Sequence, residues 1–256
     1  MKFKFIYQKV FLFARRRLIR AGFMPVHSNP HGWVPYFKTW LDSLIFGRTS
    51  YAQQGEDLTL DRILVRKLGI DLKAYNGLYV DAGAYHPVSH STSYLLYQRG
   101  WQGVCIDIAK SSCQIIARRR PRDLVLNFAT SKGYERLMFK DPGLISLIHE
   151  VKEVTSETDK ENVIEAYSLT ELLRCNGISR QIDYLNIDTE GAELKTLQGL
   201  DFSIYSPRVI SVEIHANNIS KALDTKVAKY LDSMGYECVA CNVITYFFIR
   251  AGTISH

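Results

Sequence analysis

Seven short apolar runs, most of them separated by polar or helix-like stretches, are the feature that most limits how this chain can fold. Their lengths are those of strands buried on both faces. Strands that alternate with helices indicate a mostly parallel sheet covered by helices on both sides. The runs span residues 77–81, 103–107, 124–128, 183–188, 209–214, 236–241 and 243–249.

The last two runs are too close together for a crossover helix, since only Asn242 separates them. Strands joined by so short a connection pair antiparallel. We therefore expect an α/β domain with a Rossmann-like seven-stranded sheet, mostly parallel, that ends in an antiparallel C-terminal hairpin. This layout resembles the sheet of class I methyltransferases, and the hairpin separates it from a plain dinucleotide-binding fold.

The first 49 residues differ in composition from the rest of the chain. Residues 1–50 hold nine Lys or Arg and one acid, Asp42, so the remainder carries −2 of the net charge of +6. Apolar residues at helical spacing precede a stretch rich in Pro and Gly. We expect a basic, helical and then irregular extension over 1–49, and a domain over 50–256. Residues 131–167 are charged and fit a sheet poorly, so we expect an insertion over the active site.

Two interpretations of residues 1–25 stay open. The segment either touches an anionic membrane surface peripherally, or packs its apolar side on the domain or on a partner. No apolar run reaches the roughly 18 to 20 residues that span a bilayer, and five cysteines without a pairing pattern favour a reducing compartment. We therefore expect a cytoplasmic protein, which in the first interpretation is peripheral at the inner membrane surface.

A nucleic-acid partner is not expected, although the isoelectric point is basic. The positive charge is confined to the N-terminal segment, so no stripe crosses the domain. The fourth strand ends in Asp188-Thr189-Glu190-Gly191, where enzymes that methylate a base amino group carry an Asn/Asp-Pro-Pro-aromatic turn.

Two successive strand ends carry residues suited to a nucleoside. The first ends at Asp81-Ala82-Gly83, where glycine tolerates a sharp turn and a close approach of the backbone to a ligand. The second ends at Asp107, whose carboxylate can accept both hydroxyl hydrogens of a ribose. A dinucleotide fingerprint needs three glycines, and Tyr85 and the residues after it do not supply them. The pattern indicates a nucleoside cofactor other than NAD or FAD.

The fourth and fifth strand ends carry acids and a histidine. Alternation places Glu213 and His215 on one face, and a neighbouring strand brings Asp188 close to them. These three predict a general base or a divalent metal site, and an unpaired Glu213 inside an apolar strand would cost several kcal/mol. The structural alternative is that Asp188 or Thr189 caps a helix beginning at Glu190. We expect Thr189 to be the cap and the other acids to have chemical roles.

Two further segments hold candidate residues. Gln53 and Glu56 precede the helix predicted over 58–68, for which Asp57 or Ser50 is a candidate cap. His86 and His90 follow the first strand, and either could be a base or contact a substrate.

Several separated motifs resemble the FkbM-type methyltransferases, over roughly residues 50 to 250. Ala52 and Ile108-Ala109 depart from the usual family residues. The matching motifs are Tyr51-Ala52-Gln53-Gln54-Gly55-Glu56-Asp57, Val80-Asp81-Ala82-Gly83-Ala84-Tyr85-His86-Pro87, Ser91 with Tyr94, Arg99-Gly100-Trp101 with Gly103, Ile106-Asp107, Asp183 to Gly191, and Val212-Glu213-Ile214.

The resemblance implies S-adenosylmethionine as cofactor and methyl transfer to oxygen, most often a sugar hydroxyl of a glycan or glycolipid. By position, Asp81, Gly83 and Ala84 would line the cofactor, and Asp107 would hold its ribose. The complete predicted sets are Gln53, Glu56, Asp81, Gly83, Ala84, Asp107, Ile108 and Asp188 for the cofactor, Asp188, Glu190, Glu213, His215 and His86 for catalysis, and Asp188, Glu213 and His215 for a divalent metal.

Two other functions stay open. The acceptor could be a small secondary metabolite, or the chain could be a cofactor-binding module without catalysis, since a fold does not guarantee activity.

Overall fold

The computed structural model describes residues 47–138, 152–153 and 163–252. The chain divides into two compact units, Met1–Thr49 and Ser50–His256. The predicted basic extension and its membrane contact over residues 1–25 therefore lie outside the described residues, which include only 47–49 of the first unit. Among the helices that are described, none combines the length and the apolar character needed to cross a bilayer.

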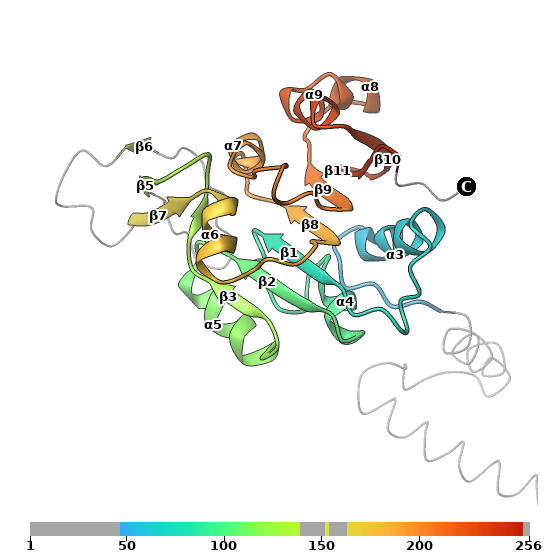
Figure 1. Cartoon of the computed structure of the whole chain (residues 1–256), viewed down its shortest axis with the longest axis horizontal. Coiled ribbons are helices and arrows are strands. Elements are labelled where there is room, and N and C mark those ends of the chain that lie inside the picture. Colours follow the sequence, from blue (N-terminus) through green and yellow to red (C-terminus); the bar gives the residue numbers. More distant parts are fainter. Residues whose placement is uncertain (1–46, 139–151, 154–162, 253–256) are drawn as a thin grey trace, which may run out of the picture. The chain divides into compact units, whose positions relative to one another are not determined.

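The second unit is built on a seven-stranded sheet whose strands follow the order β10-β11-β9-β8-β1-β2-β3 (Figure 1). The strands β3, β2, β1, β8 and β9 pair parallel, and β11 pairs antiparallel with both β9 and β10. The predicted fold class is therefore confirmed for this unit: it has the sheet of a class I methyltransferase. The strands are β1 (Leu78–Ala82), β2 (Gln102–Ile106), β3 (Leu124–Leu126), β8 (Tyr184–Ile187), β9 (Val209–Glu213), β10 (Tyr236–Asn242) and β11 (Thr245–Arg250).

The strands end where the sequence predicted polar residues. Asp81 is the fourth residue of β1, Asp107 directly follows β2, Asp188 directly follows β8, and Glu213 is the last residue of β9. Because these four strands run parallel, their carboxyl ends lie along one edge of the sheet.

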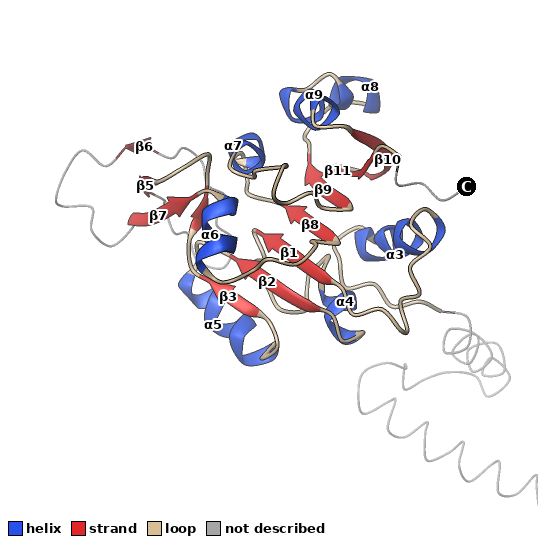
Figure 2. Cartoon of the chain, viewed as in Figure 1, coloured by secondary structure: helices blue, strands red, loops and turns tan. Residues whose placement is uncertain are grey.

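Helices cover both faces of the sheet (Figure 2). One face packs against α3 (Glu56–Arg66), α4 (Tyr94–Gln98) and α5 (Lys110–Arg119). The other packs against α6 (Leu169–Cys175), α7 (Glu193–Gln198), α8 (Ile219–Leu223) and α9 (Lys226–Ser233). The helix predicted over 58–68 is α3, displaced by two residues, and Gly69 follows its end with a left-handed φ of 64°.

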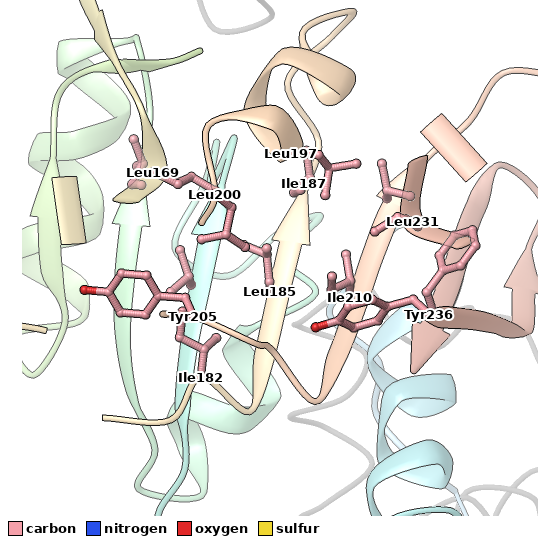
Figure 3. Packing of buried hydrophobic residues seen from close by; sticks show 14 of the residues in the cluster. Leu169, Ile182, Leu185, Ile187, Leu197, Leu200, Tyr205, Ile210, Leu231 and Tyr236 are labelled. Carbon is pink, nitrogen blue, oxygen red and sulfur yellow. The ribbon is translucent and has the colours of Figure 1, made fainter. Parts of the chain in front are cut away.

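Alternation along the strands builds a separate core on each face. Leu78 and Val80 of β1 face the α6–α9 side, and Tyr79 faces the α3–α5 side. Figure 3 shows the first core, where Leu185 and Ile187 of β8 lie near side chains of α7 and of the loop after it. Polar side chains on the second face break this pattern at Asp81 of β1, Asn186 of β8 and Ser211 of β9, all of which are buried.

A second, four-stranded sheet has the order β4-β7-β5-β6. Its strands are β4 (Ala129–Thr130), β5 (Glu135–Met138), β6 (Lys152–Glu153) and β7 (Val163–Tyr167). It contacts α7 through a buried hydrogen bond of 2.7 Å between the hydroxyls of Thr130 and Thr196. The described part of the predicted 131–167 insertion thus belongs to a sheet, whereas residues 139–151 and 154–162 lie outside the description.

Candidate functional site

A cavity of about 610 Å³ opens at the carboxyl ends of β1, β2 and β8. The wall includes most of the predicted site residues: Gln53, Asp81, Gly83, Ala84, Asp107, Ile108, Asp188 and Glu190. The predicted residues outside this lining are Glu56, His86, Glu213 and His215.

Asp81 is a carboxylate fixed from two sides. Only 2% of it is exposed, and that surface faces the cavity. Its Oδ2 accepts a hydrogen bond from the Ser93 hydroxyl (2.5 Å), and its Oδ1 accepts one from the Asn186 side-chain amide (2.9 Å). The Asn186 oxygen in turn accepts a hydrogen bond from the Ser211 hydroxyl (2.7 Å). A buried carboxylate with both oxygens satisfied keeps one orientation toward the cavity.

The Asp107 carboxylate links two backbone segments by hydrogen bonds, the turn after β1 and the start of α5. One oxygen accepts from the Tyr85 N–H (2.7 Å) and the other from the Ala109 N–H (2.8 Å). Burial, opposed by these two donors, raises the pKa of Asp107, and the charge of Asp81 adds to the rise. Because each carboxylate oxygen has a second lone pair, Asp107 retains the capacity to accept the two hydroxyl hydrogens of a ribose.

Gly83 lies against the protein backbone at Asp188. Its φ of +87° is left-handed, and a Cβ built there would lie 1.6 Å from the backbone oxygen of Asp188. The sharp turn agrees with the prediction, but the backbone that occupies the space beside Gly83 is the end of β8. The two strand ends that carry Asp81 and Asp188 are thereby held in direct contact.

Three acids gather at the cavity edge. Single carboxylate oxygens of Asp188, Glu190 and Glu213 lie within 4.8 Å of one another. Partial desolvation of Asp188, its hydrogen bond with Glu213 and the nearby negative charges raise the pKa of Asp188 to about 8. Asp188 nevertheless has its side chain open to the cavity. A carboxyl group with this pKa holds or releases a proton near neutrality.

Glu213 has the partner that its position requires. Its Oε1 lies 3.1 Å from Nε2 of His215, whose side chain is 73% exposed. The predicted proximity of Asp188, Glu213 and His215 is therefore only partly reproduced. The compact acidic set contains Glu190 where the sequence suggested His215.

The prediction that Thr189 caps the next helix is wrong. Helix α7 begins at Glu193, with Ala192 as N-cap and no side-chain capping bond. The cause is a tight turn, since Glu190 and Gly191 both have positive φ, 50° and 104°. The Glu193 carboxylate instead accepts hydrogen bonds from the N–H of Gly191 (2.8 Å) and of Thr189 (3.3 Å).

His86 bonds to its own segment, and Glu56 bonds to its own segment and to the hydroxyl of Thr245 in β11 (3.5 Å). Glu56 is 4% exposed, and its Oε2 accepts the Gln54 N–H at 2.7 Å. His86 Nδ1 accepts the N–H groups of Val88 (3.1 Å) and Ser89 (2.9 Å), and burial with nearby positive charge lowers its pKa. Both side chains shape loops beside the cavity, and their predicted contacts with cofactor or substrate stay predictions.

The cavity also has walls that the sequence did not single out. Phe128, Ala129 and Leu137 form an apolar side next to Ile108. Lys195 of α7 pairs with Glu135 of β5 at 3.3 Å, and both line the cavity. Phe128 ends the apolar run predicted over 124–128, but no sequence signal marks it or the others as cavity residues. Most of the others belong to the second sheet, which comes from a segment without strand-like alternation.

Residues 81–238 match the Methyltransferase FkbM domain by sequence. The chain belongs to this family. The match covers more than half of the chain. It includes β2, β8 and β9 and the end of β1 from Asp81, with the polar residues at these strand ends.

Solved structures similar to this FkbM methyltransferase are distant in sequence. A TehB-like SAM-dependent methyltransferase from Corynebacterium glutamicum shares 11% identity, with 87% of this chain and 100% of that chain covered and a TM-score of 0.40. A methyltransferase from Geobacter sulfurreducens shares 11% identity (93% and 96% covered, TM-score 0.41). An O-methyltransferase from Bacillus cereus in complex with SAH shares 8% identity (88% and 93% covered, TM-score 0.41). No curated protein matches the chain by sequence.

S-adenosylmethionine is the methyl donor of this FkbM methyltransferase, and the cavity fits such a molecule. The apolar wall of Ile108, Phe128 and Ala129 suits an adenine ring. The remaining lone pairs of Asp107 suit a ribose, and the buried Asp81 carboxylate suits the ammonium group at the methionine end.

Proposed function

We propose that this methyltransferase transfers a methyl group to a hydroxyl oxygen of a sugar in a glycan or glycolipid. The observation that carries the proposal is Asp188, which lines the cavity beside Glu213 and has a pKa raised to about 8. An alcohol is a weak nucleophile, and a base with a pKa near the working pH removes its proton most effectively.

Different residues would hold the cofactor and deprotonate the acceptor hydroxyl. Asp81, Asp107 and Ile108 would hold the cofactor, which supplies an electrophilic methyl group when it is bound. Ionised Asp188 takes the hydroxyl proton onto its carboxylate oxygen. The neighbouring Glu213 carboxylate, whose charge raises the pKa of Asp188, favours the proton in that position. Orientation of the acceptor oxygen toward the methyl group supplies much of the remaining rate.

A polyhydroxylated acceptor is supported by the polar part of the wall. His90, Glu190 and Lys195 line the cavity and offer donors and acceptors for several hydroxyls. A planar, apolar metabolite would displace water from these groups without replacing its hydrogen bonds. A small secondary metabolite with several hydroxyls is the second candidate acceptor.

A divalent cation is the alternative to a free base. Asp188, Glu190 and Glu213 would be its ligands, since hard cations prefer carboxylate oxygens. Removing metal by dialysis against a chelator separates the two versions. Turnover that survives dialysis assigns proton removal to Asp188 alone, and turnover restored by added Mg²⁺ or Mn²⁺ assigns it to the metal site.

The function is tested by mass spectrometry of cell-surface glycans and lipid-linked intermediates from cells with and without the gene. The proposal expects one sugar residue to lose the mass of one methylene in the deleted strain. Unchanged glycans with a demethylated small metabolite would favour the second candidate. Glycans and metabolites that are both unchanged, in a protein that binds S-adenosylmethionine in calorimetry, would favour a non-catalytic cofactor-binding module.

We also propose that the enzyme is cytoplasmic and meets the inner membrane surface through residues 1–25. The support is the excess of Lys and Arg over acids in residues 1–50. Flotation with anionic and neutral liposomes tests it, with a variant in which Arg15, Arg16 and Arg17 are changed to Gln as the comparison. Equal flotation of the two proteins on anionic liposomes would end the idea.

A further inference from the structure

Arg120 is a fully buried cation next to the cofactor cavity. It forms the C-cap of α5, and its side chain is 1% exposed. Arginine is almost never buried this completely unless its charge and donors are satisfied. Its ion pair with Asp123 is long, 3.8 Å between Nη1 and Oδ2. Most of its donors must therefore be satisfied elsewhere.

The guanidinium donates to one loop at three points. Nε donates to the Pro87 carbonyl (2.7 Å), Nη2 to the Ser91 hydroxyl (2.6 Å) and Nη1 to the Ser93 hydroxyl (3.0 Å). The ring of Tyr94 lies 5.2 Å from its central carbon, which adds a cation–π contact. The fork geometry of arginine allows one side chain to hold several points of a loop at once.

That loop is backbone-strained where it meets the cavity. Tyr85 and His90 both line the cavity, and both have left-handed φ values, 50° and 59°. Non-glycine residues persist in this region only where the surrounding structure over-determines them. Arg120 contacts the loop at Pro87, which lies between Tyr85 and His90, and at Ser91, which directly follows His90. These contacts hold the strained part of the loop in place.

The same guanidinium orients Asp81. Ser93 has one hydroxyl hydrogen, and Arg120 occupies a lone pair of its oxygen. The hydrogen is therefore directed to Oδ2 of Asp81, at 2.5 Å. The positive charge of Arg120 also interacts favourably with the Asp81 carboxylate.

We propose that Arg120 is a positioning residue for cofactor binding, acting through Ser93 on Asp81 and through Pro87 and Ser91 on the cavity loop. It does not itself line the cavity. The inference rests on the proposed assignment of this cavity to the cofactor.

The test measures binding of S-adenosylhomocysteine by calorimetry, so it does not depend on the acceptor. Loss of a hydrogen bond to a charged group predicts that Arg120→Met and Ser93→Ala each raise Kd about 10-fold. Because both act on Asp81 by one route, the double variant should bind about as weakly as the weaker single variant. Arg119→Met removes the preceding, exposed arginine and should leave Kd unchanged.

A general loss of stability would not produce this coupling, and thermal melts confirm that each variant is folded at the assay temperature. If Arg120→Met does not fold, Arg120→Lys takes its place in the cycle. A Ser93→Ala protein with the Kd of the parent, or fully additive effects on Kd, would overturn the proposal. A parent protein that does not bind S-adenosylhomocysteine would instead refute the assignment of the cavity.

Hydrogen exchange examines the loop. In Arg120→Lys, amides of residues 85–93 should exchange faster than in the parent, because lysine cannot hold three points together. Arg119→Met should exchange like the parent. Equal exchange of the loop in Arg120→Lys and the parent would remove the loop from the proposal.

Discussion

Replacing Gly83 with alanine should be among the most damaging small substitutions in the domain. Two separate penalties meet at this residue. Its φ of +87° disfavours any L side chain, and the new Cβ would lie 1.6 Å from the Asp188 carbonyl oxygen. That oxygen belongs to the backbone at the end of β8, so it cannot rotate away as a side chain would.

The magnitude follows from the two penalties. An alanine with a left-handed φ lowers the free energy of unfolding by about 1–2 kcal/mol, and overpacking lowers it by about 1–3 kcal/mol. Their sum of about 2–5 kcal/mol is a large part of the roughly 5–15 kcal/mol by which domains are stable. For a domain of this size, each kcal/mol lowers Tm by about 2–4 °C, so we expect a fall of roughly 4–20 °C.

Three other glycines separate the two penalties. Gly191 has φ +104°, and a Cβ there would have nothing within 4 Å, so Gly191→Ala isolates the strain. Gly199 has φ −81° but a Cβ would lie 2.1 Å from the Ser131 oxygen, so Gly199→Ala isolates the clash. Gly133 has neither, and Gly133→Ala should stay within about 0.5 kcal/mol of the parent.

Urea unfolding followed by circular dichroism measures all four variants, with the slope m checked for constancy. The expected order of destabilisation is Gly83→Ala above Gly191→Ala and Gly199→Ala, with Gly133→Ala least affected. A Gly83→Ala protein with the unfolding midpoint of Gly133→Ala would refute the reasoning.

The remaining predictions concern charge. Asp188→Asn should lower kcat/KM by about 100-fold or more. In the parent protein, kcat/KM should rise with pH through about 8 as the base ionises, and the variant should lack this rise. A pH–rate profile that is unaltered in the variant would exclude Asp188 as the base. Because the folded-state pKa of Asp188 lies above its unfolded value, stability should fall as pH rises between the two, and urea titrations of Asp188→Asn should show a weaker fall. Arg99→Met should cost about 1–3 kcal/mol, since it leaves buried Asp61 without its two-pronged partner, whereas Lys229→Met, which breaks an exposed pair with Asp224, should cost under about 1 kcal/mol in the same assay. Similar losses for Arg99→Met and Lys229→Met would contradict the role given to burial.

The main sheet was predictable because each of its strands leaves a local mark. Apolar runs identify the strands, and the short connection between the last two required an antiparallel pair. In the structure this connection is Val243 and Ile244, since Asn242 is the last residue of β10. The second sheet leaves no such mark. Its strand β5 (Glu135–Met138) pairs with β7 (Val163–Tyr167) across a long connection, and Glu135, Arg136 and Glu165 make both strands look solvent-exposed.

The cavity residues divide in the same way. Asp81, Asp107 and Asp188 were identifiable because the end of a parallel strand is a fixed place in such a fold. Arg120 was not, since Arg118, Arg119 and Arg120 together have the composition of a solvated helix end. Only the packing of α5 against β2 and the loop after β1 shows that the third arginine is buried.

Gly83 fixes the distance between the cofactor side of the cavity and the proposed base. The turn after β1 carries the cofactor-side residues Asp81 and Ala84, and the end of β8 carries Asp188. The Asp188 backbone oxygen fills the space that a side chain at position 83 would need. The two strand ends are therefore packed directly against each other, and their separation is fixed. Methyl transfer is sensitive to displacements of about 1 Å between the reacting groups, which can cost about 100-fold in rate. In Gly83→Ala molecules that remain folded, the base should therefore be displaced from the methyl donor, so kcat should fall more than the affinity for S-adenosylhomocysteine. An equal loss of both would mean that the glycine serves the cofactor alone.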